Sequence, residues 1–396
     1  MRKPLEHIKV LDFTRVLAGP YCTMILANMG AEIIKIERPG SGDDSRDFGP
    51  FMNGQSAYFV SINRGKKSIA LDLKSPKAIE LVKELVKEVD IVAENFRPGT
   101  MEKLGIGYEE LKKINPKLIF ATMSGFGQTG PYSKRPAYDM IVQGMGGIMS
   151  ITGEEGGDPV RVGTSIGDIT AGMFGTIGIL AALVDRDISG EGRMVDVAML
   201  DGQLSILENA ISRYTATGEV PKPLGARHPS IAPFEAYKTK DSYVIVACGN
   251  DALWEKFCKL TSREDLLAMD EFKTNPDRVK NVRKLKEYMT EIFGQKTTAE
   301  WDEYLNKNGI PCSAINTVDK LFTDPQVAAR KMLVEVEQPG VGKIKIAGNP
   351  IKLSGLEEEI PKDAAPQIGE HSELILKKYL GYTDEQIAEL KKENII

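Results

Sequence analysis

Histidine and cysteine are scarce in this chain, and most metal and disulfide chemistry in proteins depends on them. Its 396 residues include three histidines and four cysteines. The cysteines form no CxxC pair, and no HExxH, HxE or clustered His/Cys pattern offers the spacing of metal ligands. The sequence therefore predicts no bound metal and no disulfide framework.

Long apolar runs and blocks of one charge are also missing. No stretch of 18 or more consecutive apolar residues occurs, so we expect no membrane partner. The net charge is −5 and the two signs are interspersed, which is typical of a solvated surface and predicts no nucleic-acid partner. The first residues lack the apolar stretch of a signal peptide, so we expect a cytoplasmic protein.

Motifs of other enzyme classes are present only in part. Gly125–Gly130 (GFGQTG) fits the GxGxxG pattern, but Pro131 follows where a dinucleotide-binding fold needs a helix. An NAD(P)-dependent oxidoreductase is therefore a remote alternative. Gly65–Ser68 resembles the end of a P-loop, yet Val60 stands where the first glycine belongs. No GxSxG elbow supports a serine hydrolase.

Short apolar runs alternate with helical patterns in the first half of the chain. This alternation is typical of βαβ units on a parallel sheet, so the predicted fold class is α/β. The runs that predict strands are Ile8–Phe13, Ala31–Glu37, Ser68–Leu73, Asp90–Glu94, Leu118–Ser124 and Met194–Met199.

A long apolar segment, Asp168–Asp185, predicts a further helix, and its glycines at 172, 175 and 178 indicate that another element packs closely against it. Asp168 stands at the start of this segment. An acid there is commonly an N-cap. A helix N-terminus also stabilises an anion, and an ionised carboxylate is a competent nucleophile toward an activated acyl group. The two roles can coexist.

Composition also indicates more than one domain. A Pro/Gly-rich stretch near residue 220 predicts a linker, and strand and helix patterns resume beyond it. The last segments have no obvious core of their own, so we expect them to pack on the first domain. The predicted parts are a large domain of residues 1–198 plus 333–396, a linker at 199–225, a small domain at 226–318 and a return linker at 319–332.

Ten segments carry a resemblance to a known family. They are Lys3–Leu5, Val10–Phe13, Ala18–Pro20, Gly30–Asp43, Asn63–Lys74, Val92–Gly99, Gly167–Asp168, Gly178–Leu183, Gly309–Cys312 and Gly369–His371. In these segments, and in their order, the chain resembles the class III coenzyme A transferases, also called the CaiB/BaiF or formyl-CoA transferase-like family. The resemblance covers essentially the whole chain.

The resemblance implies a Rossmann-like large domain built from both termini, an inserted small α+β domain and an intertwined homodimer. It implies transfer of coenzyme A from an acyl-CoA to a free small carboxylic acid. Asp168 would be the nucleophile, passing through an aspartyl–acyl anhydride and an aspartyl–CoA thioester. The CoA thioester would be a substrate, and no permanently bound cofactor is implied.

The resemblance also implies which residues hold coenzyme A. Arg38, Lys74 and Lys103 would meet its phosphates or adenine end, because cations must offset the nucleotide's charge. Tyr138 would stand near the reacting thioester. The turns implied to line the CoA groove are Val16, Leu17 and Ala18, then Leu71, Asp72, Leu73 and Lys74, and then Asn95, Phe96 and Arg97.

The chain departs from the family pattern at several positions. Leu17 replaces a glutamine of formyl-CoA transferases, and Cys248–Ala252 replaces their glycine-rich loop, which argues against oxalate as a substrate. Lys103 replaces an arginine and loses the guanidinium fork. The α-methylacyl-CoA racemases of the same fold use a histidine where Tyr138 stands. An unperturbed tyrosine, with a pKa of about 10, is a poor base at neutral pH, so the racemase is the alternative and the transferase is favoured.

Overall fold

The computed structural model describes residues 3–356, 360 and 363–396. The chain forms two compact units. The first comprises Met1–Ile148, Arg161–Gly218 and Pro325–Ile396, and the second comprises Met149–Val160 and Glu219–Asp324. The predicted limits do not coincide with these units. Met149–Val160 belongs to the second unit, and both predicted linkers are divided: residues 199–218 and 325–332 belong to the first unit, and residues 219–225 and 319–324 belong to the second.

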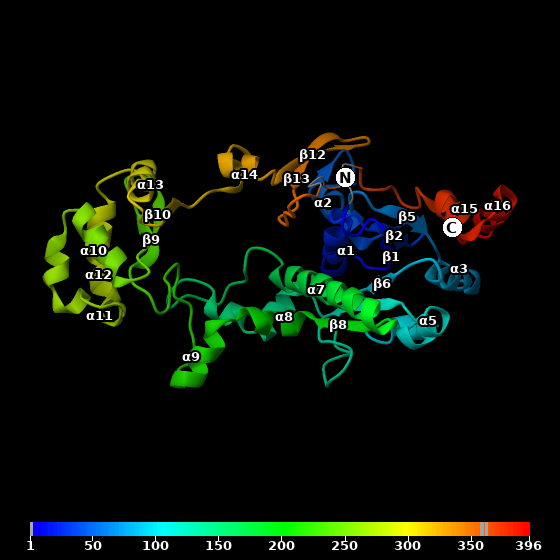
Figure 1. Ribbon diagram of the computed structural model, residues 1–396, viewed down its shortest axis with the longest axis horizontal. Coiled ribbons are helices and arrows are strands. Elements are labelled where there is room, and N and C mark those ends of the chain that lie inside the picture. Colours follow the sequence, from blue (N-terminus) through cyan, green and yellow to red (C-terminus); the bar gives the residue numbers. More distant parts are fainter. Residues whose placement is uncertain (1–2, 357–359, 361–362) are drawn as a thin grey trace. The chain divides into compact units, whose positions relative to one another are not determined.

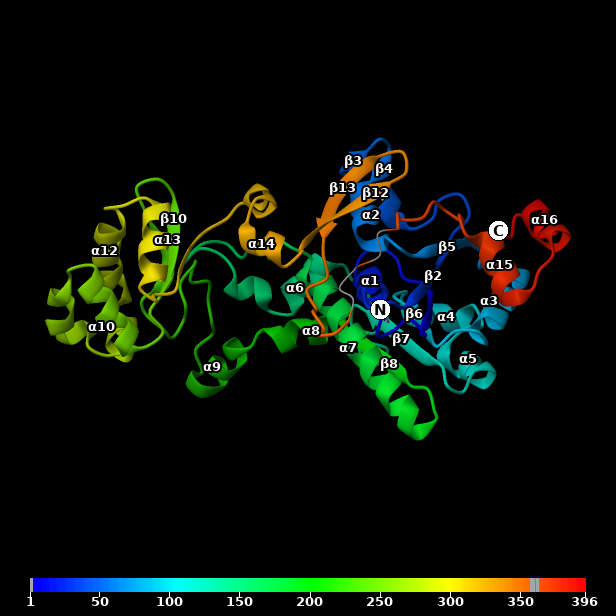
Figure 2. The ribbon, with the colours of Figure 1, turned by 45° about the horizontal axis from the view of Figure 1, so that its top comes forward.

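A six-stranded sheet forms the centre of the first unit (Figures 1 and 2). Every strand pairing in it is parallel, which confirms the predicted α/β sheet. Counted along the chain, its strands lie in the order 3-2-1-4-5-6, the order of doubly wound nucleotide-binding sheets. In space the strands are β5 (Lys67–Ala70), β2 (Glu32–Glu37), β1 (Lys9–Asp12), β6 (Ile91–Glu94), β7 (Ile119–Ser124) and β8 (Met194–Ala198).

Both faces of this sheet are covered, which explains why its strands read as continuous apolar runs. Successive side chains of a strand point to opposite faces, and Val10 and Leu11 of β1 accordingly belong to different cores. Helices α1 (Ala18–Asn28) and α7 (Ile166–Ser189) contribute to the core around Val10. The core around Leu11 includes α3 (Pro76–Val86), α5 (Tyr108–Ile114), α15 (Ser372–Leu380) and α16 (Asp384–Lys392).

The glycines of α7 allow close packing, as the sequence predicted. A Cβ atom at Gly172 would lie 2.7 Å from the Ala18 carbonyl oxygen, and one at Gly175 would lie 2.7 Å from Met123 Sδ. Helix α7 is longer than the predicted Asp168–Asp185. By length and composition it is the one helix of the described chain that could cross a membrane, although core helices meet the same criterion. Its inner face packs on α1 and β7.

The C-terminal segment belongs to the first unit. Ser372 Oγ accepts a hydrogen bond from Ala70 N at 3.1 Å, and Asp72 N donates to Ile395 O at 2.9 Å. Helices α15 and α16, red in Figures 1 and 2, lie beside α3. The preceding segment forms a hairpin of β12 (Leu333–Gln338) and β13 (Gly342–Ala347).

The segment after β7 turns without starting a helix. Gly127 N donates to Ser124 Oγ at 3.0 Å, and the next helix, α6 (Asp139–Met145), begins only at Asp139. No helix therefore opens at Gly130, as a dinucleotide fingerprint requires. The first unit also contains α2 (Ala57–Asn63), α4 (Thr100–Lys103), α8 (Met199–Ile206), α9 (Asn209–Thr217), α14 (Pro325–Ala329) and the short pair β3 (Phe51–Met52) and β4 (Gln55–Ser56).

The second unit has a core of its own. Its antiparallel sheet has the order β11-β10-β9. Trp254, Phe257, Phe293 and Trp301 pack together in that core. Its elements are β9 (Phe234–Lys238), β10 (Tyr243–Ala247), α10 (Asp251–Leu260), α11 (Asn275–Lys280), α12 (Val282–Phe293), α13 (Thr298–Lys307) and β11 (Cys312–Ala314).

Two ion pairs are buried beneath the carboxyl ends of β1 and β2. Lys35 Nζ lies 2.8 Å from Asp43 Oδ2, and Lys66 Nζ lies 3.2 Å from Asp12 Oδ2. All four side chains are 1% exposed or less. Burial alone would raise the pKa of Asp43, but Lys35 and hydrogen bonds outweigh it and hold that pKa well below its ordinary value. Burial lowers the pKa of Lys66 to about 8.

We expect Lys35→Ala to lower the free energy of unfolding by about 3–5 kcal/mol, because it leaves the Asp43 carboxylate buried without its cation. Urea denaturation followed by circular dichroism measures the change. Lys87→Ala is the matched control, since the Lys87–Glu84 pair is exposed and water screens it. Equal losses of unfolding free energy in the two variants would show that the buried pair stabilises the protein no more than the exposed pair does.

Candidate functional site

A cavity of about 540 Å³ lies where the strand order reverses, between β1 and β6. Open α/β sheets bind ligands at such a switch point, outside the carboxyl ends of the strands. The walls come from the segments that follow β1, β2, β5 and β6. The lining residues are 13–15, 35–39, 42–43, 71–74, 96, 100, 104 and 394.

The cavity brings together part of the predicted CoA groove. Six predicted residues line it, namely Arg38, Leu71, Asp72, Leu73, Lys74 and Phe96. Arg38 and Lys74 are exposed and come from different strand ends. Two cations in the lining of one pocket suit the phosphates of a nucleotide. A third cation, Arg15, was missed by the sequence analysis, although it directly precedes a predicted turn.

The other predicted residues lie outside the lining of this cavity. Lys103 ends α4 with an exposed side chain, and Arg97 is exposed on the loop after β6. Tyr138 is 78% exposed and directly precedes α6. Leu17 and Ala18 are buried at the start of α1.

Val16 and Asn95 shape the loop before α1. Val16 has a φ of 66°, a left-handed conformation that is unusual for a β-branched residue. Its N–H donates to Asp43 Oδ1 at 3.0 Å. Asn95 holds the backbone of Arg15 from both sides, accepting from its N–H at 2.9 Å and donating to its carbonyl at 2.7 Å. The loop is thus fixed by the residues that follow β2 and β6.

Asp168 lies in the first turn of α7, where the sequence placed an acid at a helix start. The N-cap position belongs to Ser165, so Asp168 is not the N-cap. Burial, and then the negative charge of Asp139, raises the pKa of Asp168 to about 7. Burial and Asp139 thus oppose the stabilisation of the anion that the sequence predicts from the helix N-terminus. Within the described ranges, no residue donates a hydrogen bond to the Asp168 carboxylate.

Tyr58 lies within electrostatic range of Asp168 and of Asp43, a residue of the cavity wall. Its pKa is raised to about 12, first by burial and then by the charges of Asp168, Asp43 and Asp139. Since Asp43 lines the cavity, the Tyr58 phenol lies within electrostatic reach of both the cavity wall and Asp168. Sequence reasoning missed Tyr58 and Asp139. Asp139 could have been noticed, because it adjoins the predicted Tyr138, but no pattern marks Tyr58.

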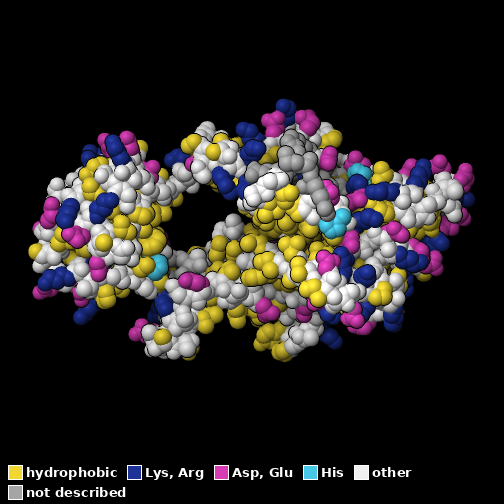
Figure 3. Space-filling model, viewed as in Figure 1, with side chains coloured by type: hydrophobic (Ala, Val, Ile, Leu, Met, Phe, Trp, Pro, Cys, Tyr) yellow, Lys and Arg dark blue, Asp and Glu magenta, His cyan; other side chains and the backbone are white. Residues whose placement is uncertain are grey.

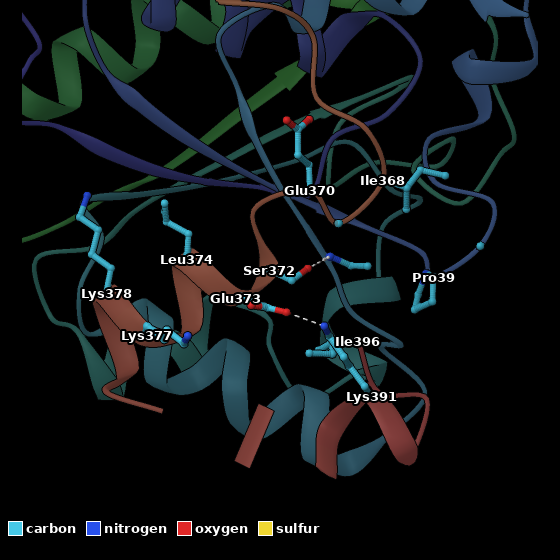
Figure 4. A pocket seen from close by; sticks show the side chains of 13 residues that line it. Pro39, Ile368, Glu370, Ser372, Glu373, Leu374, Lys377, Lys378, Lys391 and Ile396 are labelled. Atoms are coloured by element: carbon cyan, nitrogen blue, oxygen red, sulfur yellow. Dashed lines mark hydrogen bonds and ion pairs between the residues drawn. The ribbon is translucent and has the colours of Figure 1, made fainter. Parts of the chain in front are cut away.

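A larger cavity, of about 930 Å³, lies beside α15 (Figure 4), and Asp168 lines neither this cavity nor the one at the switch point. The lysines of the larger cavity, Lys377, Lys378 and Lys391, pair with Asp384, Glu32 and Glu373. These cations are already paired. At the switch point Arg15 is paired with Asp44, but Arg38 and Lys74 have no ion pair within the described chain, so that cavity is the better candidate for binding an anionic ligand.

In the part of the chain that the structure describes, no group of three or more His, Cys, Asp or Glu side chains could hold a metal ion. The buried acids Asp12 and Asp43 are instead paired with lysines.

Sequence comparisons agree with this geometry. A family model described as CoA-transferase family III matches residues 5–372. Human succinyl-CoA:glutarate CoA-transferase is 39% identical over 395 residues, covering 100% of this chain and 90% of its own length. Acetyl-CoA:oxalate CoA-transferase of Acetobacter aceti is 42% identical over 377 residues, covering 95% of this chain and 96% of its own.

A solved structure is similar along almost the whole chain. A CaiB/BaiF family protein from Brucella suis superposes with a TM-score of 0.84 at 38% sequence identity. The match covers 96% of this chain and 100% of that one. The segments from which the resemblance was inferred are therefore those of a true relative, and the chain belongs to CoA-transferase family III.

Proposed function

We propose that this enzyme transfers coenzyme A from succinyl-CoA, or a similar short acyl-CoA, to a small dicarboxylic acid. The relatives support this choice of substrates. Human and Agrobacterium fabrum relatives are named for succinate or succinyl-CoA and glutarate, and a Haloarcula hispanica relative for succinyl-CoA and mesaconate. One structural observation carries the proposal, namely the buried carboxylate of Asp168, which receives no hydrogen bond within the described chain and acts electrostatically on Tyr58, as does Asp43 of the cavity wall.

Asp168 acts as the nucleophile in this proposal. Its carboxylate attacks the thioester carbonyl, and the C–S bond breaks to give an aspartyl–acyl anhydride and CoA thiolate. The thiolate attacks the aspartyl carbonyl, forming an aspartyl–CoA thioester and releasing the donor acid. The acceptor carboxylate then displaces CoA thiolate to form a second anhydride. Thiolate attack on its acyl carbonyl yields the new acyl-CoA and restores Asp168.

The surroundings of Asp168 suit this role. A carboxylate whose pKa is near 7 is a stronger nucleophile than one with an ordinary pKa, yet a large fraction is ionised at neutral pH. Hydrogen bonds would have to break before attack, and the described chain provides none. The first turn of α7 places positive partial charge beside the carboxylate. Arg15, Arg38 and Lys74 would hold the nucleotide end of coenzyme A.

The enzyme is also proposed to be a homodimer. Met173, Ile177, Val184 and Ile188 form one exposed apolar face on α7, each being 47–84% exposed. Figure 3 shows hydrophobic side chains gathered over α7. The opposite side of α7 already packs on the sheet, so this exposed face is not needed for the core of the chain. Such an apolar face is typical of a surface that a second copy of the chain covers.

We expect Asp168→Ala to lose CoA transfer by at least about 10³-fold, because the acyl-accepting group is gone. Wild type and variant are incubated in D₂O with succinyl-CoA and a panel of acids (glutarate, mesaconate, citramalate, oxalate), and products are identified by mass spectrometry. CoA binding, measured by calorimetry, should persist in the variant.

Two outcomes would contradict the proposed function. Transfer by Asp168→Ala at the wild-type rate would remove Asp168 from the mechanism. Deuterium at the α-carbon of the acyl group without any new thioester would identify a racemase.

The raised pKa of Asp168 also predicts a pH-dependent stability. The folded state holds this proton up to about pH 7, while the unfolded carboxyl releases it near its ordinary value of 3.8. The stabilisation from the bound proton is therefore lost as the pH rises from about 4 through 7. We expect Asp168→Asn to melt about 3 °C or more above the wild type at pH 8, and the gap to narrow toward pH 4. Scanning calorimetry measures both; a gap independent of pH would contradict the assigned pKa.

Light scattering tests the proposed dimer. The wild type should have twice the chain mass of 43.5 kDa at micromolar concentration. Ile177→Lys, which places a charge in the apolar face, should shift the mass toward that of one chain. Glu303→Lys, on the exposed surface of α13, is the control and should leave the dimer intact. A monomeric wild type would refute the dimer.

A further inference from the structure

Asp139 is a second carboxylate beside the proposed nucleophile. It begins α6 and is 9% exposed. Its Oδ1 accepts a hydrogen bond from Gly167 N at 2.8 Å, and its Oδ2 accepts one from Gln143 Nε2 at 2.7 Å. Asp139 thus satisfies one of the free N–H groups at the start of α7, one residue before Asp168.

Gln143 extends this contact to the segment that leads into α7. Its side chain is fully buried. Its Oε1 accepts from Val162 N at 2.9 Å, and its Nε2 also donates to Thr164 O at 3.3 Å. The Gln143 amide therefore bonds to two backbone groups of a segment that has no regular secondary structure. It also bonds to the Asp139 carboxylate, which accepts from Gly167 N.

The close approach of Asp139 favours glycine at position 167. A Cβ atom there would lie 3.0 Å from Asp139 Oδ1, closer than ordinary contacts allow. The Gly167-Asp168 pair of the family pattern thus has a physical reason at its first residue. Glycine lets the Asp139 carboxylate reach the backbone.

The charges around Asp168 are unusual. The charged group that acts on Asp168 is Asp139, from α6, and Asp168 in turn acts on the Tyr58 phenol, from α2. No cation of the described chain lowers the pKa of Asp168. Lys35, the buried cation of this region, is paired with Asp43. The Asp139 carboxylate accepts hydrogen bonds from Gly167 and Gln143, whereas no residue of the described chain donates one to Asp168. Two acids left together without a cation cost stability, which points to a functional reason.

We propose that Asp139, held by Gln143, is a positioning residue that fixes the backbone beside Asp168 and keeps a second negative charge next to it. This role rests on the proposed function, in which Asp168 attacks a thioester. The fixed backbone directs the Asp168 carboxylate. The neighbouring charge makes that carboxylate more basic and so a stronger nucleophile once it is ionised.

Asp139→Asn tests the charge with little change in shape. We expect the acid limb of the pH–rate profile, which reports the ionisation of Asp168, to move to lower pH by about 1 unit or more. The plateau rate above that limb should fall by about 10-fold. Gln143→Met removes the hydrogen bonds but keeps the charge, so its plateau should fall while its pH midpoint moves less. Asp187→Asn, an exposed acid at the far end of α7, is the matched control and should change neither quantity.

A thermal double-mutant cycle tests the same coupling without catalysis. At pH 8 the gain in melting temperature from Asp168→Asn should be clearly smaller in the Asp139→Asn background than in the wild type, because the repulsion is already relieved. In the Asp187→Asn background the gain should be unchanged.

The outcomes separate the two proposals. Additive melting-temperature shifts, or an Asp139→Asn pH profile that overlays the wild type, would overturn the role of Asp139 whether or not the enzyme transfers CoA. A wild type that transfers CoA to no acid, with the thermal coupling present, would refute the proposed function instead.

Discussion

The buried ion pair between Lys35 and Asp43 fixes the loops at the carboxyl ends of β1 and β2, on which the candidate site depends. Neither charge reaches water, so each must be satisfied by the other and by hydrogen bonds. Lys35 also donates to the Thr14 carbonyl at 2.6 Å, and Asp43 accepts from the Val16 N–H at 3.0 Å. One pair on β2 and its following loop thereby sets the backbone that follows β1, including the left-handed turn at Val16.

The position of Asp168 follows from that turn. The turn starts α1, and the Ala18 carbonyl of α1 lies so near Gly172 that no side chain would fit there. Helix α7 is therefore held against the start of α1, with Asp168 one turn before the contact. Asp139 and Gln143 secure the segment that enters α7 from the other side. The acid is thus fixed from two directions while its own oxygens stay free for reaction.

Much of this arrangement could be predicted from the sequence. Both faces of the sheet are buried, so its strands read as apolar runs and were found within a few residues. The glycines of α7 indicated close packing before the partner was known.

The ion pairs could not be predicted, because Asp12 and Lys66 are 54 residues apart and charged residues are normally exposed. Tyr58 could not be predicted either, because it is far from Asp168 in the sequence and only the folded chain brings α2 near Asp168 and Asp43. Helices α8 and α9 are separated at Glu208, whose φ of 49° no sequence pattern predicts.

The proposed mechanism requires Asp168 to become covalently bound to coenzyme A, and mass spectrometry of the protein can detect this bond. The enzyme is mixed with succinyl-CoA in the absence of an acceptor acid, quenched in acid and digested. We expect a peptide containing Asp168 whose mass has increased by that of a CoA thioester, and hydroxylamine should convert it to the hydroxamate. An adduct on another residue, or turnover with no adduct detectable during the reaction, would show that Asp168 is not the nucleophile.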